Sequence, residues 1–63
     1  MKVYFDKTKK EYIVKAENVN SMLKELEIQK NTVIVSVNNE LVDEDYIFKK
    51  SDKVKVYSVV SGG

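Results

Sequence analysis

The sequence lacks the two residue types on which most metal centres and nucleophilic active sites depend. It contains no cysteine and no histidine, so it has no thiolate, no disulfide and no imidazole that titrates near neutral pH. Zinc sites and Cys-His or Ser-His-Asp arrangements are therefore excluded. A chain of 63 residues also buries too little surface to wall a substrate pocket. These absences predict a binding protein, or a protein that is itself a substrate, rather than an enzyme.

Arginine is also absent, and the charges nearly cancel. All 11 basic residues are lysines, 10 residues are acidic, and the net charge is +1. Nucleic-acid binders usually carry a clear basic excess and use the arginine fork, so no nucleic-acid partner is expected. No apolar run approaches the roughly 18 residues of a membrane span, and no signal peptide is recognisable. We therefore expect a cytoplasmic protein without a membrane partner, monomeric when free.

The first half of the sequence predicts a hairpin followed by a helix. β-branched and aromatic residues indicate strands over residues 2–5 and 11–15. Apolar residues then recur at helical spacing behind Asn18, a good N-cap, which predicts a helix over roughly residues 18–28. We expect it to end before Asn31, because asparagine tolerates the left-handed conformation that often closes a helix.

The second half predicts three further strands. Residues 32–37 form the most strongly β-branched run in the chain. The asparagines at 38–39 both tolerate positive φ and suit a two-residue hairpin turn into a short strand over residues 40–42. The last strand is expected from Lys53 to about Val59.

This order predicts an α+β fold, in which one helix packs across one face of a mixed sheet of four to five strands. We expect a single domain over residues 1–60 and a flexible, reactive tail over residues 61–63. Ile13 and Val14 are both apolar, and the sequence leaves open which of them faces the core. The predicted core consists of Val3, Phe5, Val14, Val19, Met22, Leu23, Leu26, Val35, Val37, Phe48, Val54 and Val56.

The chain contains two glycines, and they are its last two residues, Gly62 and Gly63. Random placement would put both there in about one arrangement in 1,950, and no glycine is used in a turn, where it is usually needed. A frayed end or a remnant of cloning is the alternative explanation. The functional explanation is that two residues without a Cβ pass through a narrow channel and carry the chain end into a buried active site.

This combination resembles the ubiquitin-like β-grasp proteins and, among them, the ThiS/MoaD sulfur carriers. The resemblance covers the whole chain. Its marks are Asn18-Val19 followed by Met22-Leu23 and Leu26, Val35-Ser36-Val37-Asn38 with Leu41-Val42, Ser51-Asp52-Lys53-Val54, and Val60-Ser61-Gly62-Gly63. The family commonly has Asn-Gly at positions 38–39 and Gly-Asp at positions 51–52, and both departures concern turn geometry rather than function.

The resemblance implies that the Gly63 carboxylate, presented by the tail residues Ser61 and Gly62, is adenylated by a ThiF/MoeB-like activating enzyme that uses ATP. A sulfur donor then displaces AMP and leaves a thiocarboxylate, a 1-thioglycine, at Gly63. An accepting synthase would use this sulfur in thiamin biosynthesis, molybdopterin (molybdenum cofactor) biosynthesis or tRNA thiolation. The chain itself would need no cofactor and no metal.

Two other functions remain open. Related archaeal members also form isopeptide bonds to lysines, so a ubiquitin-like modifier shares the activation step and differs in the final acceptor. A noncovalent binding module such as the TGS domain would explain the fold but not the terminal glycines.

Tyr4 and Tyr57 are predicted to share the sheet face away from the helix, on strands that the resemblance makes adjacent and parallel. With Val59 and Val60 they would form an apolar patch that docks the activating enzyme. The alternative is that they are ordinary surface aromatics, which are frequent in strands.

Three charged features have simpler explanations. The lysines within residues 7–10 could meet an acidic partner, or form a solvated loop that discourages aggregation. The acidic run at residues 43–45 lacks the glycine of a calcium loop and favours a solvated loop over a metal site. Asp52 is expected to accept backbone hydrogen bonds in the turn before the last strand.

Overall fold

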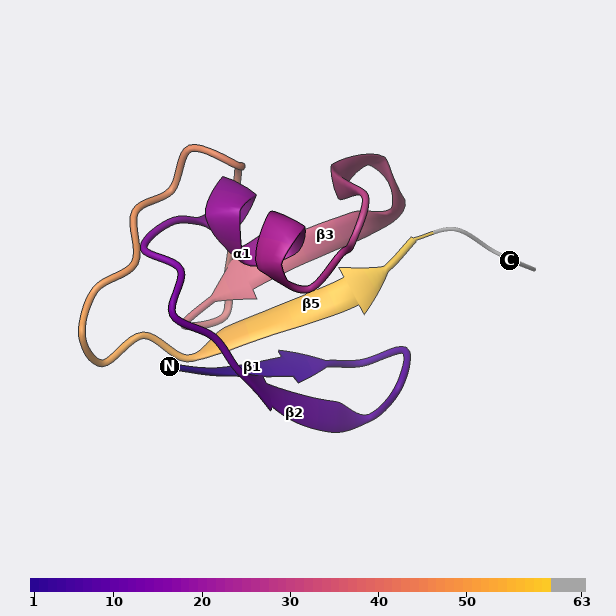
Figure 1. The fold of residues 1–63 in the computed structure, drawn as a ribbon, viewed down its shortest axis with the longest axis horizontal. Helices are drawn as coiled ribbons and strands as arrows, with labels where there is room; N and C mark the ends of the chain where they lie inside the picture. Colours follow the sequence, from indigo (N-terminus) through magenta and orange to yellow (C-terminus); the bar gives the residue numbers. More distant parts are fainter. Residues whose placement is uncertain (60–63) are drawn as a thin grey trace.

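Within residues 1–59, which a computed structural model describes, five strands form one mixed sheet and one α-helix lies across one of its faces. In chain order the elements are β1 (Lys2–Phe5), β2 (Lys10–Ile13), α1 (Val19–Glu25), the 3-10 turn η1 (Lys30–Thr32), β3 (Val33–Val37), β4 (Glu40–Val42) and β5 (Val54–Ser58). The strand order across the sheet is β2-β1-β5-β3-β4, with β1 and β5 parallel and the other neighbours antiparallel (Figure 1). This is the predicted α+β, β-grasp arrangement.

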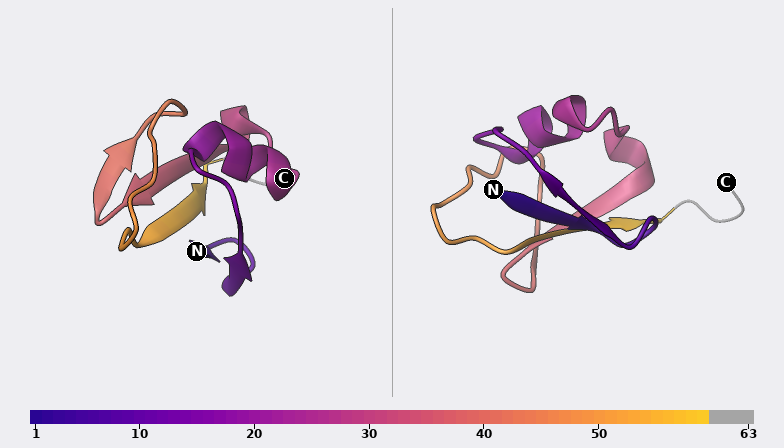
Figure 2. Two further views of the ribbon diagram at one scale, coloured as in Figure 1. Left: turned by 60° about the vertical axis from the view of Figure 1, so that its left-hand side comes forward. Right: turned by 60° about the horizontal axis from the view of Figure 1, so that its bottom comes forward.

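The helix position follows from the strand directions. β2 and β3 run the same way, because each is antiparallel to one strand of the parallel pair β1 and β5. A connection between two strands of the same direction must cross a face of the sheet, and α1 lies in that connection. Figure 2 shows α1 and η1 on the same side of the sheet. The opposite side, which carries no helix in the described part of the chain, is called the outer face below.

The second strand is shifted from its predicted position, Lys10–Ile13 instead of residues 11–15. Lys15 does not continue the ladder because its N–H is bonded to the Glu25 carboxylate at 3.1 and 3.2 Å. The structure also resolves the ambiguous pair, since Val14 is buried and Ile13 is 69% exposed. Val14 donates its N–H to the Met1 carbonyl at 2.9 Å, which holds it against the core.

The helix is shorter than predicted, Val19–Glu25 instead of residues 18–28. Its start is confirmed, because the Asn18 side chain accepts the Ser21 N–H at 2.7 Å. Its end is set by Glu27, not by Asn31, since Glu27 has φ 59°.

The helix terminus has the two bonds of a Schellman motif. Ile28 donates its N–H to the Leu23 carbonyl at 2.8 Å, and Glu27 donates to the Lys24 carbonyl at 3.1 Å. The apolar side chains of Leu23 and Ile28 occupy the two positions that commonly touch in this motif. A glutamate in the left-handed conformation costs about 1–2 kcal/mol relative to glycine. A glutamate at this position therefore does not predict the end of a helix.

The hairpin between β3 and β4 forms as predicted. Asn38 and Asn39 have φ 52° and 70°, the two positive values that a type I′ turn requires. β3 begins at Val33 rather than at residue 32, because Thr32 belongs to η1 and bonds to the Gln29 carbonyl through both its N–H and its hydroxyl. β5 likewise spans Val54–Ser58 and is shorter than the predicted residues 53–59.

The core lies between α1 and the inner face of the sheet, and the whole predicted core is confirmed. Of its members, Phe5, Leu26 and Phe48 are partly buried and pack against the rest. The buried members are Val3, Val14, Val19, Met22, Leu23, Val35, Val37, Val54 and Val56. Short β-branched side chains dominate the strand side, which lets the small helix sit close to the sheet.

Asp52 joins two segments through its carboxylate, the β3–β4 turn and the connection between β4 and β5. It accepts the Lys49 N–H at 2.8 Å and the Tyr46 hydroxyl at 2.9 Å on one oxygen, and the Asn38 amide at 3.0 Å on the other. Asn38 in turn accepts the Lys53 N–H at 3.0 Å. The predicted backbone bond of Asp52 is therefore confirmed, and the same side chain also ties the β3–β4 turn to the long connection before β5.

These bonds favour the charged form of Asp52. The Lys49 N–H, assisted by the Tyr46 hydroxyl and the Asn38 amide, holds the pKa of Asp52 below its ordinary value. The hydrogen bond to Asp52 likewise raises the pKa of Tyr46. Because the pKa of Asp52 is lower in the folded state, ionised Asp52 stabilises the fold above the unfolded pKa of about 3.9, and this contribution is lost as pH falls through the folded value.

We therefore expect Asp52→Asn to lower Tm near pH 7, and the difference from the parent protein to shrink as pH falls below about 3.9. Thermal unfolding across this pH range measures both effects. Asp45→Asn is the matched control, because it removes the same charge from an exposed side chain. Equal losses of Tm in the two variants, or a difference that does not change with pH, would contradict the role of Asp52.

Candidate functional site

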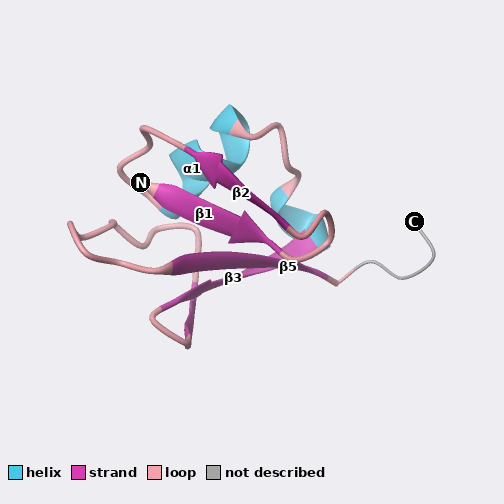
Figure 3. Ribbon diagram, turned by 90° about the horizontal axis from the view of Figure 1, so that it is seen from below, coloured by secondary structure: helices cyan, strands magenta, loops and turns pink. Residues whose placement is uncertain are grey.

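The outer face of the sheet carries the predicted tyrosines together. Tyr4 is paired with Lys55 across β1 and β5, and Tyr57 follows two residues later on the same face of β5. Their neighbours Val54 and Val56 are buried on the α1 side, so Tyr4 and Tyr57 lie on the outer face. The view from below in Figure 3 shows β1 and β5 side by side. The predicted placement of both tyrosines is confirmed, and their docking role stays a prediction.

Two apolar residues of β3 and β4 on this face were missed by the sequence reasoning, and Ile13 of β2, the cross-strand partner of Lys2, is a third. Ile34 is the cross-strand partner of Tyr57 and is 40% exposed, and Leu41, next to Ser36, is 71% exposed. The run 33–37 is apolar at four of its five positions, so its alternation between faces is hidden. In β4, Leu41 and Val42 are adjacent apolar residues, so the sequence leaves open which of them faces inward.

The apolar part of the outer face leads to the point where the described chain stops. Val59 is 51% exposed, and its N–H is bonded to the Thr32 carbonyl at 2.9 Å. This bond fixes Val59 beside the first residues of β3. Val60, Ser61, Gly62 and Gly63, which complete the predicted docking patch and tail, lie outside the described residues.

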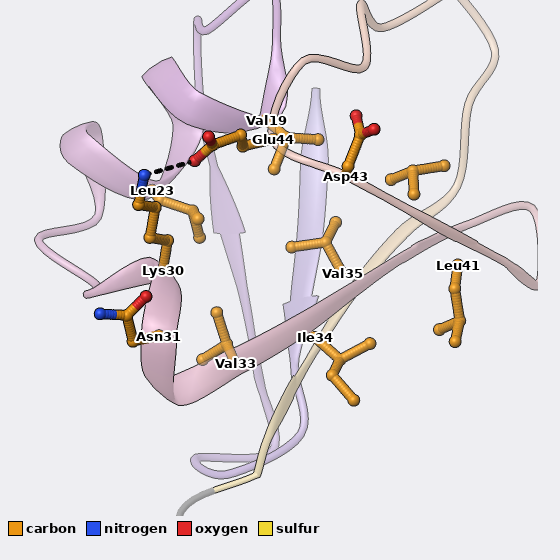
Figure 4. A pocket seen from close by; sticks show the side chains of 11 residues that line it. Val19, Leu23, Lys30, Asn31, Val33, Ile34, Val35, Leu41, Asp43 and Glu44 are labelled. Carbon is orange, nitrogen blue, oxygen red and sulfur yellow. Dashed lines mark ion pairs between the residues drawn. The ribbon is translucent and has the colours of Figure 1, made fainter.

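A groove of about 540 Å³ lies where the β3–β4 edge of the sheet meets α1 and η1, and Ile34 and Leu41 of the outer face also line it. Figure 4 shows Val35 and Ile34 on opposite sides of the β3 ribbon, with Leu23 and Val19 on the side of Val35. An ion pair of 2.9 Å between Lys30 and Glu44 crosses one end of the groove. Its hydrogen bond raises the pKa of Lys30, but both side chains are substantially exposed, so the pair adds little stability.

The acidic run at residues 43–45 is used for local structure. Asp43 accepts the Asp45 N–H at 3.0 Å, and Glu44 is paired with Lys30. Within residues 1–59 no group of three or more acidic side chains is placed to hold a metal ion. No helix in the same part of the chain is long and apolar enough to cross a membrane.

The outer face offers contact area on neighbouring strands. Neighbouring strands present apolar and aromatic side chains on this face, those of Tyr4, Ile34, Leu41, Tyr57 and Val59. Such a surface suits the binding of another protein, because aromatic anchors supply much contact area at little cost in side-chain entropy.

Comparison with models of protein families shows the family to which the chain belongs. The model described as the ThiS family matches residues 3–63, which is all but the first two residues. The chain belongs to the ThiS family. The match extends over Gly62 and Gly63. ThiS-family proteins are small sulfur carriers rather than enzymes, and they interact with activating enzymes and sulfur-accepting partners. A comparison with curated proteins gives no match.

For this sulfur carrier, we expect the outer-face apolar residues to be dispensable for folding. Leu41→Thr should change the free energy of unfolding by less than about 0.5 kcal/mol, because the side chain is mostly exposed and threonine keeps the strand propensity. Met22→Ala, a change in the core, should cost about 2–5 kcal/mol. Urea unfolding measures both values. A large loss for Leu41→Thr would mean that this residue serves the fold and not a partner.

Proposed function

We propose that the chain carries sulfur on its C-terminal glycine. The Gly63 carboxylate attacks the α-phosphate of ATP on a ThiF/MoeB-like adenylating enzyme, and pyrophosphate leaves. A sulfide-level nucleophile then attacks the acyl carbon, AMP leaves, and Gly63 becomes a 1-thioglycine. The observation that carries this proposal is the ThiS family match, which runs through the two glycines at positions 62 and 63.

Adenylation is the necessary step, because a carboxylate is a poor acyl donor with oxide as its leaving group, whereas AMP is a good one. The enzyme must therefore bring the chain end to ATP while the folded body stays outside. Residues 61–63 span at most about 10 Å when extended. Glycines at 62 and 63 suit a narrow channel, since neither carries a Cβ.

The composition supports a division of labour between carrier and enzyme. Because the chain has no histidine and no cysteine, the base, the metal or the thiol that such steps need would come from its partners. The sulfur acceptor would be a synthase of thiamin or molybdopterin biosynthesis, or of tRNA thiolation. Activation at Gly63 serves a protein modifier equally, and the final acceptor distinguishes the two.

The test of the tail is a block of its end. We expect one additional residue after Gly63 to lower ATP-dependent adenylation by about a hundredfold or more, because the acyl carbon would be displaced from its reactive position. One residue added before Met1 is the control and should leave the rate unchanged. Pyrophosphate release with a ThiF/MoeB-like enzyme of the source organism measures the rate. Full activity of the C-terminally extended protein would contradict the proposal.

The intact mass of protein recovered from its native cells separates the possible acceptors. Replacement of one oxygen by sulfur at Gly63 would support the carrier function. Gly62-Gly63 remnants on lysines of other proteins would instead support the modifier. An unmodified carboxylate in every sample, with no conjugates and no adenylate, would favour a noncovalent module such as the TGS domain.

We further propose that Tyr4, Tyr57, Val59 and Val60 contact the activating enzyme. Tyr57→Ala should weaken binding to that enzyme by about tenfold or more, because buried aromatic residues dominate many interfaces. The cross-strand pair of Tyr57 with Ile34 adds little stability, so the variant should stay folded. Ile47→Ala, at an exposed apolar residue beside Asn18, is the control. Unchanged affinity of Tyr57→Ala, measured by titration calorimetry, would exclude this docking surface.

A further inference from the structure

Three lysines gather at the end of the outer face opposite to Val59. Tyr4 is paired with Lys55, and Val3 is paired with Val54. Lys2 and Lys53 each precede this second pair by one residue and line the same groove. All three lysines are exposed and line, with Tyr4, a groove of about 320 Å³. We call Lys2, Lys53 and Lys55 the lysine end.

Among the described residues, the charge of the lysine end is only partly balanced, because three lysines share the groove with two carboxylates. Among residues 1–59, the ion pair between Lys30 and Glu44 is the only one within 4.0 Å. Asp52 borders the groove, and its carboxylate stays charged because its donors, the Lys49 N–H, the Tyr46 hydroxyl and the Asn38 amide, are neutral, so it offsets part of the lysine charge. Glu11, the cross-strand partner of Tyr4, is the other acid lining the groove.

Within residues 1–59, these three lysines add no ion pair to the fold. Like charges on neighbouring positions of a sheet repel one another and destabilise it. Carboxylates of a bound partner would relieve the repulsion between Lys2 and Lys53. The lysine end therefore has the properties of a surface adapted to a partner rather than to the fold.

We infer that the lysine end binds an acidic surface of the enzyme that activates the chain end, so that the outer face docks with a charged half and an apolar half. This inference rests on the proposed function. Lys55 and Val59 are four residues apart along the same strand direction, or about 13 Å. The acidic surface of the enzyme would thus lie roughly 13–20 Å from the point where the tail departs, with Lys53 at the far limit.

A protein partner fits this face better than nucleic acid. The lysines adjoin Tyr4, and the apolar residues Ile34 and Tyr57 continue the same face. Glu11 would repel phosphates, and the chain contains no arginine for bidentate contacts. Charge pairing of this kind raises the rate of encounter and selects the partner orientation.

Charge reversal tests the inference. Lys55→Glu and Lys53→Glu should each weaken binding of the full-length chain to a ThiF/MoeB-like enzyme of the source organism by about tenfold at 50 mM salt. The effect should shrink to about twofold at 0.5 M salt, where charges are screened within a few ångströms. The adenylation rate at saturating carrier should not change. Lys24→Glu, the same charge change on α1, is the control and should stay within twofold of the parent protein.

A neutral variant separates binding from folding. Lys53→Gln removes the repulsion with Lys2, so it should raise Tm while it weakens binding to the enzyme. A purely structural role for Lys53 would lower Tm instead, and that result would overturn the inference.

The remaining outcomes are distinguishable from failure of the proposed function. If the parent protein is adenylated and the lysine variants bind like Lys24→Glu, the inference falls and the proposed function stands. If the parent protein is never adenylated, both fall. Binding of a fluorescent single-stranded oligonucleotide that is lost in Lys55→Glu would assign the face to nucleic acid and overturn the inference.

Discussion

The parallel pairing of β1 and β5 is the constraint on which the rest of the structure depends. It brings the first strand and the last strand to the centre of the sheet, where Val3, Val54 and Val56 are buried side by side. It also makes β2 and β3 run in the same direction, which requires the crossing connection that contains α1. One long-range pairing thus requires a connection across the sheet, and the helix in that connection covers one of the two faces.

The two faces of the sheet have different physical tasks. On the inner face, burial of short apolar side chains against α1 supplies the stabilisation that a chain of 63 residues needs without disulfides or metals. On the outer face, tyrosines, isoleucine and lysines remain in contact with water. Such a separation suits a sulfur carrier of the ThiS family, whose surface must recognise partners while its body stays unchanged.

Local sequence signals predicted most of the fold, and they failed where a distant contact decided the outcome. Asn18 predicted the helix start because its side chain accepts a hydrogen bond from the adjacent backbone. The asparagines at 38–39 predicted the turn because asparagine tolerates positive φ. Glu27 gave no such signal, because glutamate does not favour the left-handed conformation that it adopts here. That conformation accompanies the hydrogen bond from the Ile28 N–H to the Leu23 carbonyl. Ile34 was missed as part of the candidate site because an almost entirely apolar strand does not reveal which side faces outward. The tail was inferred from the two glycines alone, and its structure lies outside the described residues.

The parallel central pair also separates the two ends of the chain. Because β1 and β5 are parallel, Met1 lies at the end of the sheet where both strands begin. Val59 follows β5 at the end where both strands finish. The Met1 ammonium donates to the Val14 carbonyl at 3.1 Å, and the N–H of a peptide bond in its place would still donate one hydrogen. A dye, an affinity handle or a whole folded domain attached before Met1 would therefore stand across the molecule from Val59. Such an attachment would leave the surface around Val59 uncovered.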